Sequence, residues 1–163
     1  MEILGFSGCH ESIRFKKREF PGLSRREYRI AQGFDSAAAL LIEGKVESAV
    51  AEERFNREKA TGDFPIRSIR YCLDHAGLTP HDIDVIAHGF CYEPYEAYFG
   101  MSDYTRRQYK EVFAPEVSKR LIAEHFPGTG LDEKLVSVPH HIAHAASSYY
   151  LSGFDEALVL VSD

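Results

Sequence analysis

The sequence predicts an α/β protein in which a mixed sheet carries helices on its faces. Two observations lead to this fold class: three strand-like runs precede residue 53, and helical and strand-like segments then alternate to the end of the chain. Hairpins followed by alternating helices and strands favour a mixed sheet covered by helices. Ligands of such sheets bind beside the carboxyl ends of the strands, so candidate functional residues are expected directly after them.

The first three strands are expected at residues 2–6, 36–42 and 46–52. The second and third are joined by residues 43–45, where Gly44 can supply the positive φ that a tight hairpin turn requires. We therefore expect these two strands to pair antiparallel.

Residues 10–32, between the first two strands, form a basic segment with seven Lys or Arg against three Glu. Blocks of like charge are usually exposed, so we predict a solvated loop inserted into the domain at about residues 10–32. The alternative is a lid that attracts anions over a phosphate site.

The later elements alternate in type. Pro65 opens a helix and Gly77 ends it, because proline suits a first helical turn and glycine suits the residue after the last one. Proline also disfavours helical geometry in the residue before it, so a break is expected at Ala114-Pro115. The expected elements are a loop at 54–63, a helix at 66–76, a strand at 83–87, a helix at 103–126, a strand at 135–138 and a helix at 139–151.

The composition is that of a soluble globular protein, with 44% hydrophobic and 27% charged residues. A net charge of −6 argues against a surface that coats nucleic acid, and no apolar run reaches the roughly 18 residues of a membrane span. The three cysteines, Cys9, Cys72 and Cys91, are widely spaced and odd in number. They indicate reduced thiols in a cytoplasmic protein, not a disulfide framework.

The last residues, 156–163, read Glu-Ala-Leu-Val-Leu-Val-Ser-Asp. A nearly continuous apolar run of this length predicts a strand that is buried on both faces. Such a strand needs neighbours and a covering layer, so we expect the chain to be the N-terminal piece of a longer protein. The alternative is a complete domain whose last strand lies in the middle of its own sheet.

The segment 138–150 carries the strongest chemical signal. His140 and His144 are four residues apart, which on a helix means about 40° of rotation and roughly 6 Å of rise, so both project from one face. Two imidazoles in this arrangement can chelate one divalent metal, whereas His141 is rotated by about 100° from His140. Pro139 is expected at the first helical position, so the helix dipole favours a neutral His140. The alternative is a hydrogen-bonded pair beside the core.

Asp163 closes the strand-like run that follows these histidines. Its carboxylate would complete a set of two histidines and one carboxylate with open positions for substrate, which suits Fe(II), Mn(II) or Zn(II). The alternative for Asp163 is a residue exposed to solvent.

Several motifs occur in a compatible order along the chain. They read Asp-Ser-Ala-Ala-Ala-Leu at 35–40, Glu-Glu-Arg-Phe-Asn-Arg-Glu-Lys at 52–59, and His-His-Ile-Ala-His-Ala at 140–145. Together they resemble the N-terminal Kae1-like domain of O-carbamoyltransferases of the NodU/CmcH type. The resemblance covers most of residues 1–9 and 33–163 and is weakest between residues 92 and 134.

The resemblance implies the first half of an actin-like ATPase (RNase H-like) fold over residues 1–163, with the basic insertion inside it. It also implies that His140, His144 and Asp163 bind a metal, taken to be iron(II). In this family a C-terminal domain makes carbamoyladenylate from carbamoyl phosphate and ATP. The Kae1-like domain then transfers the carbamoyl group to a hydroxyl of a small-molecule acceptor such as a natural product or a saccharide.

The nucleotide is expected to contact four residues of the matched motifs. Arg54, Arg57 and Lys59 would hold phosphate or adenylate oxygens, and Asp35 lies in the matched early-strand motif. The alternative for the basic residues is a solvated charged loop.

The chain departs from the family pattern at two positions. Phe34 stands where the family has a histidine before Asp35, and Ala60 follows Lys59 where the family has a histidine. We expect His10 to replace the first of these histidines only if the intervening segment folds back.

The function expected from the sequence is that of a fragment of a cytoplasmic, ATP-dependent O-carbamoyltransferase. It is not expected to be active alone, because the adenylate-forming domain is missing from this chain. Two alternatives remain: a non-catalytic nucleotide- or metal-binding module on the same fold, and a related carbamoyl-transfer maturation factor. The acidic charge outside the basic segment argues weakly against an RNA acceptor, so nucleic acid is not an expected partner.

Overall fold

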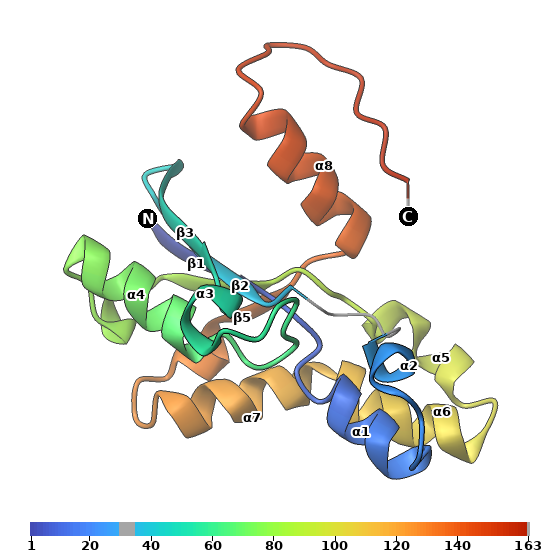
Figure 1. Cartoon of the computed structure of the whole chain (residues 1–163). Coiled ribbons are helices and arrows are strands. Elements are labelled where there is room, and N and C mark those ends of the chain that lie inside the picture. Colours follow the sequence, from blue (N-terminus) through green and yellow to red (C-terminus); the bar gives the residue numbers. More distant parts are fainter. Residues whose placement is uncertain (30–34, 163) are drawn as a thin grey trace.

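The computed structural model of the chain describes residues 1–29 and 35–162. Within them, five strands form one mixed sheet in the order β3-β2-β1-β4-β5 (Figure 1). β2 runs antiparallel to β1 and β3, whereas β4 and β5 run parallel to β1 and to each other. The predicted mixed α/β sheet is therefore confirmed. The strands are β1 (Glu2–Ser7), β2 (Ala37–Ile42), β3 (Lys45–Ala51), β4 (Val85–His88) and β5 (Leu135–Ser137).

A two-residue turn joins β2 and β3, as the glycine in it predicts. Ile42 pairs with Lys45, and the two turn residues, Glu43 and Gly44, both have positive φ, 51° and 76°. Two positive φ values in succession match the right-handed twist of the flanking strands. The hairpin prediction is confirmed, with Glu43 sharing the left-handed backbone.

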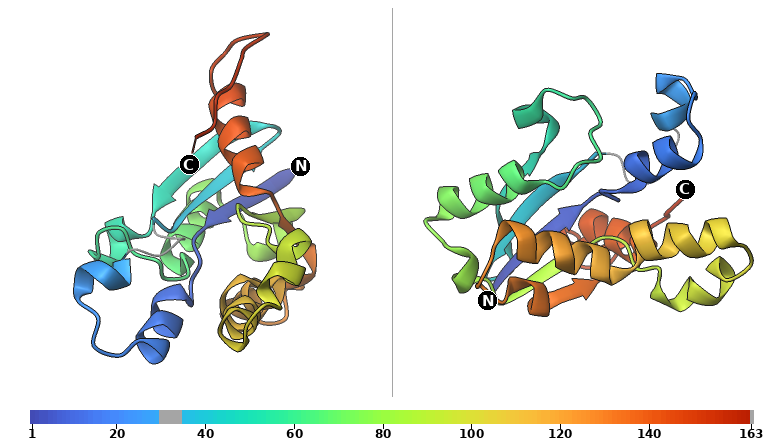
Figure 2. Two further views of the ribbon diagram at one scale, coloured as in Figure 1. Left: turned by 90° about the vertical axis from the view of Figure 1, so that its right-hand side faces the viewer. Right: turned by 90° about the horizontal axis from the view of Figure 1, so that it is seen from below.

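Helices α4 (Ile66–Ala76) and α7 (Pro115–His125) cover one face of the sheet. Alternate residues of the strands point into this layer, and Leu4, Leu40 and Ile86 are fully buried there against Ile69 and Ile122. The opposite face carries α8 (His140–Tyr150), which rises away from the sheet in Figure 1 and in the left view of Figure 2. The core therefore lies on one side of the sheet.

The predicted start of α4 after Pro65, its predicted end at Gly77 and the predicted break before Pro115 are all confirmed. α4 ends at Gly77, whose φ of 68° allows Leu78 N–H to donate to the Leu73 carbonyl. The break before Pro115 is present too, because Ala114 is extended with ψ 140° and α7 begins at Pro115. The chain before that break forms α5 (Glu96–Phe99), α6 (Asp103–Gln108) and the π-helical turn η3 (Tyr109–Phe113).

The predicted loop at residues 10–32 is helical over most of its length, whereas the expected exposure of its charge is confirmed at Arg14, Lys17 and Arg18. The segment forms α1 (Ser12–Glu19) and α2 (Arg25–Arg29); residues 30–32 lie outside the described ranges. α1 is helical because Phe15 is buried, with its ring 5.5 Å from that of Tyr104 on α6. Lys16, Lys17 and Arg18 lie in its last turn, where the helix dipole favours positive charge.

Two further expectations about local structure are corrected. The predicted loop at 54–63 begins with a single helical turn, α3 (Glu53–Asn56). The predicted buried strand at 156–163 is absent over residues 156–162, where Leu158 is 98% and Leu160 89% exposed. This run lies beyond α8 and pairs with no strand of the described sheet, so its backbone has no ladder to join. The interpretation that it forms a central strand of the chain's own sheet is therefore wrong as well.

The short connections complete the description. They are the 3₁₀ turns η1 (Pro80–Asp82), η2 (Glu93–Tyr95) and η4 (Leu131–Lys134). Among the described helices, none combines the length and the apolar character needed to cross a bilayer.

Glu52, the residue after β3, caps α4 across the fold. Its side chain is buried, and its Oε2 accepts hydrogen bonds of 2.8 Å from both the backbone N–H and the hydroxyl of Ser68. Pro65, at the start of the helix, provides no side-chain cap. The first turn of α4 therefore depends on a carboxylate from another element.

Replacing Glu52 with alanine should lower the free energy of unfolding by about 2 kcal/mol, because Ser68 loses the acceptor for two buried donors. Urea denaturation followed by circular dichroism measures the change. Glu47→Ala on β3 serves as the control, since this half-exposed carboxylate should matter by no more than about 0.5 kcal/mol. Equal losses in the two variants would contradict the capping role.

Candidate functional site

Histidine side chains gather at the carboxyl ends of the three parallel strands. His10 follows β1, His88 ends β4 and His140 follows β5. Their rings form a row together with Phe90 and His144. The centroid distances along it are 5.7 Å from His10 to His88, 5.5 Å to Phe90, 4.6 Å to His140 and 4.4 Å to His144. The structure thus brings His140 and His144 together at the edge of the sheet where ligands are expected.

The Nε2 atoms of His140 and His144 lie 3.0 Å apart. Nδ1 of His140 lies 3.2 Å from the carbonyl oxygen of Gly89, which only accepts hydrogen bonds. In a neutral ring that makes this bond, Nδ1 carries the proton and Nε2 keeps its lone pair. The backbone after β4 therefore orients His140 with an acceptor nitrogen directed at His144.

The spacing of these two nitrogens suits two kinds of interaction. Two imidazoles bound to one cation at about 2.0–2.1 Å place their nitrogens roughly 3.0–3.4 Å apart, so the pair fits a shared metal. The same distance suits a hydrogen bond in which His144 Nε2–H donates to His140 Nε2. The geometry thus accommodates both interpretations that the sequence leaves open.

The environment of the pair is partly open. His140 is half-buried under the stacked ring of Phe90, and His144 is exposed. His141 is exposed, with its ring centroid 6.1 Å from that of His140. Pro139 precedes the helix instead of occupying its first position, so His140 is the first helical residue. Its place at the positive end of the helix dipole is as expected.

The third expected ligand, Asp163, lies outside the described residues, as does Phe34. Within residues 1–29 and 35–162, no group of three histidine, cysteine or acidic side chains is arranged to hold a metal ion. The structure therefore defines two of the three expected ligands.

Of the four residues expected at the nucleotide, three lie at the far end of the same sheet edge, beside β3, and Asp35 lies between them and the histidine pair. Arg54, Arg57 and Lys59 are exposed at and after α3, which follows edge strand β3, and Arg54 pairs with Glu53 at 3.6 Å. Asp35 is exposed just before β2. β3 and β5 are four strand spacings apart, about 19 Å, so the structure does not bring the basic residues to the histidine pair.

The end of β1 and the residues just before β2 lie side by side. The Ser7 hydroxyl donates to the Asp35 carbonyl over 3.0 Å. Gly8, with φ 118°, lies so close to Ser36 Oγ and the His10 ring that a Cβ there would collide with the hydroxyl. His10 and Ser36 therefore lie near one another, next to the matched motif, and the replacement of the missing histidine by His10 stays a prediction.

His10 and His88 are held neutral by their surroundings. Burial, and then the nearby His88, lowers the pKa of His10 to about 3. Burial also lowers the pKa of His88 to about 4, although its Nε2 lies 2.8 Å from the Gly8 carbonyl. Within the described residues, the His10 ring nitrogens and Ser36 Oγ are buried without a well-formed hydrogen bond, and the backbone of Gly62 and Asp63 lies beside the ring.

Sequence reasoning missed His88 and Ser36. The available signal was Ser7-Gly8 at the end of the first strand. A glycine directly after a strand permits close approach of another segment, and in the structure that segment contains Ser36. His88 directly follows the strand expected at residues 83–87, which carries no motif. Its burial therefore had no local signal.

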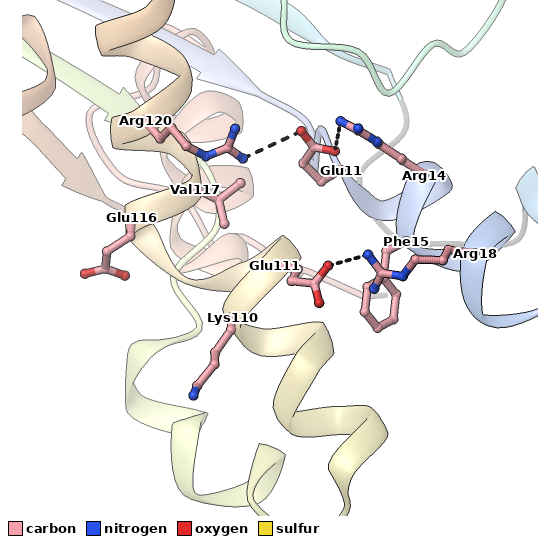
Figure 3. A pocket seen from close by; sticks show the side chains of 9 residues that line it. All are labelled: Glu11, Arg14, Phe15, Arg18, Lys110, Glu111, Glu116, Val117 and Arg120. Carbon is pink, nitrogen blue, oxygen red and sulfur yellow. Dashed lines mark hydrogen bonds and ion pairs between the residues drawn. The ribbon is translucent and has the colours of Figure 1, made fainter.

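A separate groove of about 620 Å³ lies between α1 and α7 (Figure 3). Glu11 pairs with Arg14 and Arg120 at 3.7 Å, and Glu111 pairs with Arg18 at 2.6 Å. These arginines face glutamates, so the positive charge at the groove is largely balanced. The interpretation of the basic segment as an anion-attracting lid stays a prediction.

One family model matches most of the chain, and three relatives are similar to it. The model for Carbamoyltransferase N-terminus matches residues 30–163. The chain is 38% identical over 168 residues to Nodulation protein NolNO of Sinorhizobium fredii, covering 100% of this chain and 23% of that protein. It is 34% identical over 146 residues to an uncharacterised protein of Synechocystis sp., covering 79% of this chain and 23% of that protein.

A third relative is a short protein. The chain is 45% identical over 76 residues to an uncharacterised 19.2 kDa protein of Rhizobium etli, covering 41% of this chain and 44% of that protein. The chain thus spans less than a quarter of the length of the two relatives from Sinorhizobium and Synechocystis.

Stability should fall as the pH is lowered from 6.5 towards 4. The folded-state pKa values of His10 and His88 lie below the ordinary value of about 6.5, so below that pH the unfolded chain binds more protons. Relative to pH 7, each of the two histidines should lower the free energy of unfolding at pH 5 by about 1–2 kcal/mol. Urea midpoints between pH 7 and pH 5 test this.

His10→Phe and His88→Asn should each flatten that dependence, because each removes one titrating ring. His81→Asn, at an exposed position, is the control and should leave the slope unchanged. A slope that survives loss of both buried rings would show that other groups cause it.

Proposed function

The chain belongs to the family of carbamoyltransferase N-termini, and on that premise we propose that it forms the metal-bearing front half of a cytoplasmic, ATP-dependent O-carbamoyltransferase. The reaction passes a carbamoyl group from carbamoyladenylate to a hydroxyl of a small molecule, a natural product or a saccharide, and releases AMP. The formation of the adenylate from ATP and carbamoyl phosphate belongs to polypeptide beyond the matched segment. The fold proposed for the chain is the first half of an actin-like ATPase, which the antiparallel β1–β3 meander followed by two parallel strands supports.

One observation carries this proposal: the pair of Nε2 atoms 3.0 Å apart at the carboxyl end of β5. His140 and His144 would hold a divalent metal, with Asp163 as the third ligand, and two histidines with one carboxylate suit iron(II). When bound, such a metal supplies Lewis-acid polarisation of an oxygen. The Gly89 carbonyl keeps the His140 proton on Nδ1, and Phe90 covers one face of the ring.

The nucleotide is proposed to lie along the same edge, towards β3. Arg54, Arg57 and Lys59 would meet its phosphate oxygens, because charge-assisted hydrogen bonds from arginine and lysine to phosphate are among the strong ones. Asp35 stands between these residues and the histidine pair, where β2 begins. The carbamoyl end of the adenylate would then point along the edge towards the histidine pair.

His10 is proposed to serve in place of the histidine that Phe34 replaces. Its neutral imidazole lies beside Gly8 and Ser36, and a neutral ring can accept a hydrogen bond from a hydroxyl. The second candidate function is a non-catalytic binding module on the same fold. The residues that favour it are Phe34 and Ala60, which stand where the family has histidines.

The chain should bind about one iron(II), manganese(II) or zinc(II) ion through the histidine pair. His140→Ala and His144→Ala should each weaken binding at least about 10-fold, as loss of a ligand removes half of the described donor set. Equilibrium dialysis followed by elemental analysis measures this. His141→Ala is the matched control, because its exposed ring lies outside the pair and its removal should leave binding intact. Unchanged metal content in all three variants would refute the site.

The polypeptide that includes the adenylate-forming domain should release AMP from ATP and carbamoyl phosphate when a hydroxyl acceptor is present. His10→Ala should reduce this acceptor-dependent release at least about 10-fold. The double change His10→Ala, Phe34→His should restore part of it, since a histidine then stands at the family position. Adenylate formation without AMP release to any hydroxyl acceptor would favour the binding module instead.

A further inference from the structure

The face of the sheet opposite α4 and α7 is largely uncovered. A hollow of about 700 Å³ lies between this face and α8. Small side chains line most of it, whereas the neighbouring strand residues Leu4, Leu40 and Ile86 on the other face are fully buried. The residues of the hollow include Gly5, Ala39, Ala49, Ala87, Ala143 and Ala146.

α8 touches this face only near its first turn. The Ala143 side chain lies 3.9 Å from the position of a Cβ at Gly89, yet α8, all of whose residues are described, buries none of them. The helix then leads to the apolar run at 157–161, in which Leu158 and Leu160 are almost fully exposed. The helix and the run lie on the side of the sheet that carries the hollow (Figure 1). Large exposed apolar surfaces mark interaction sites.

The relatives indicate what covers this side. The whole chain aligns with the Sinorhizobium relative but spans only 23% of its length, so most of that protein's polypeptide lies outside the matched segment. The other side of the sheet already has its layer, formed by α4 and α7. The side with the hollow is therefore where additional polypeptide can bury apolar surface.

We propose that the polypeptide following the matched segment in the relatives docks on this face, with apolar side chains filling the hollow and a strand pairing with residues 157–161. The small residues of the floor allow a close approach of the docked layer. The hollow is bordered by His88 and by Gly89, whose carbonyl orients His140. The docked polypeptide would then lie next to the histidine pair. This inference deepens the proposed function, on which it rests for the identity of the partner.

Cysteine labelling tests the docking without any measurement of activity. Single cysteines are introduced at Ala39 on the floor and at Ala146 on α8, with Ala97→Cys on exposed α5 as the matched control. Cys91→Ser removes the most accessible natural thiol, since Cys9 and Cys72 are buried. Maleimide labelling rates are then compared in two proteins: the 163-residue chain, and the same chain continued after Asp163 by the polypeptide that follows the matched segment in the Sinorhizobium relative.

Labelling at positions 39 and 146 should be at least about 10-fold slower in the continued chain, while position 97 reacts equally fast in both. Adding Ala143→Arg to the continued chain should restore fast labelling at position 146, because the arginine side chain occupies the hollow and prevents the added polypeptide from docking there. Circular dichroism confirms that each variant is folded. Equal rates at positions 39 and 146 in the two proteins would overturn the proposal. A concentration-dependent slowing in the 163-residue chain alone, with twice its mass in light scattering, would also overturn it in favour of a second copy. Loss of carbamoyl transfer would not affect these rates, so the two proposals fail separately.

Discussion

The parallel direction of β1, β4 and β5 is the constraint on which the rest of the structure depends. Because these strands point the same way, their carboxyl ends meet at one edge, and residues from sequence positions as distant as His10 and His140 approach there. The antiparallel hairpin β2–β3 adds to this edge, since β3 ends where β1 ends and α3 leaves from it. Every candidate functional residue that the structure describes lies at or just beyond this edge.

Backbone carbonyls and burial set the chemistry of the histidines at that edge. The Gly89 carbonyl fixes the proton of His140 on Nδ1, and the Gly8 carbonyl partners Nε2 of His88. Burial lowers the pKa of both His10 and His88, so these rings are neutral at physiological pH. The edge thus presents neutral nitrogen donors and acceptors, and the cationic residues Arg54 and Lys59 stand apart from it on the β3 side. This separation suits a site in which a metal and an anionic nucleotide occupy different ends.

The sheet is packed on one face only. The helices on that face, α4 and α7, are held by buried side chains, whereas α8 on the other face is held by few contacts. α4 and α7 hold their positions through fully buried side chains such as Ile69 and Ile122, and through the Glu52 cap. α8 holds its position chiefly through its first turn, where His140 bonds to Gly89 and stacks on Phe90. The same residues that form the candidate metal pair therefore also attach α8 to the sheet. A change at Gly89 or Phe90 would act on both.

The sequence by itself determined the features that depend on neighbouring residues: the β2–β3 turn at Gly44, the α4 boundaries, the break before Pro115, and the common face of His140 and His144. These follow from backbone preferences and helix spacing, which act within a few residues. Only the tertiary structure decided the rest. α1 is a helix because Phe15 packs against Tyr104. Residues 156–162 form no strand because no described strand pairs with them. His88 is buried by elements distant in sequence. Charge and apolar runs show what a segment can bury, but the partner that buries it is set by contacts between elements far apart in the chain.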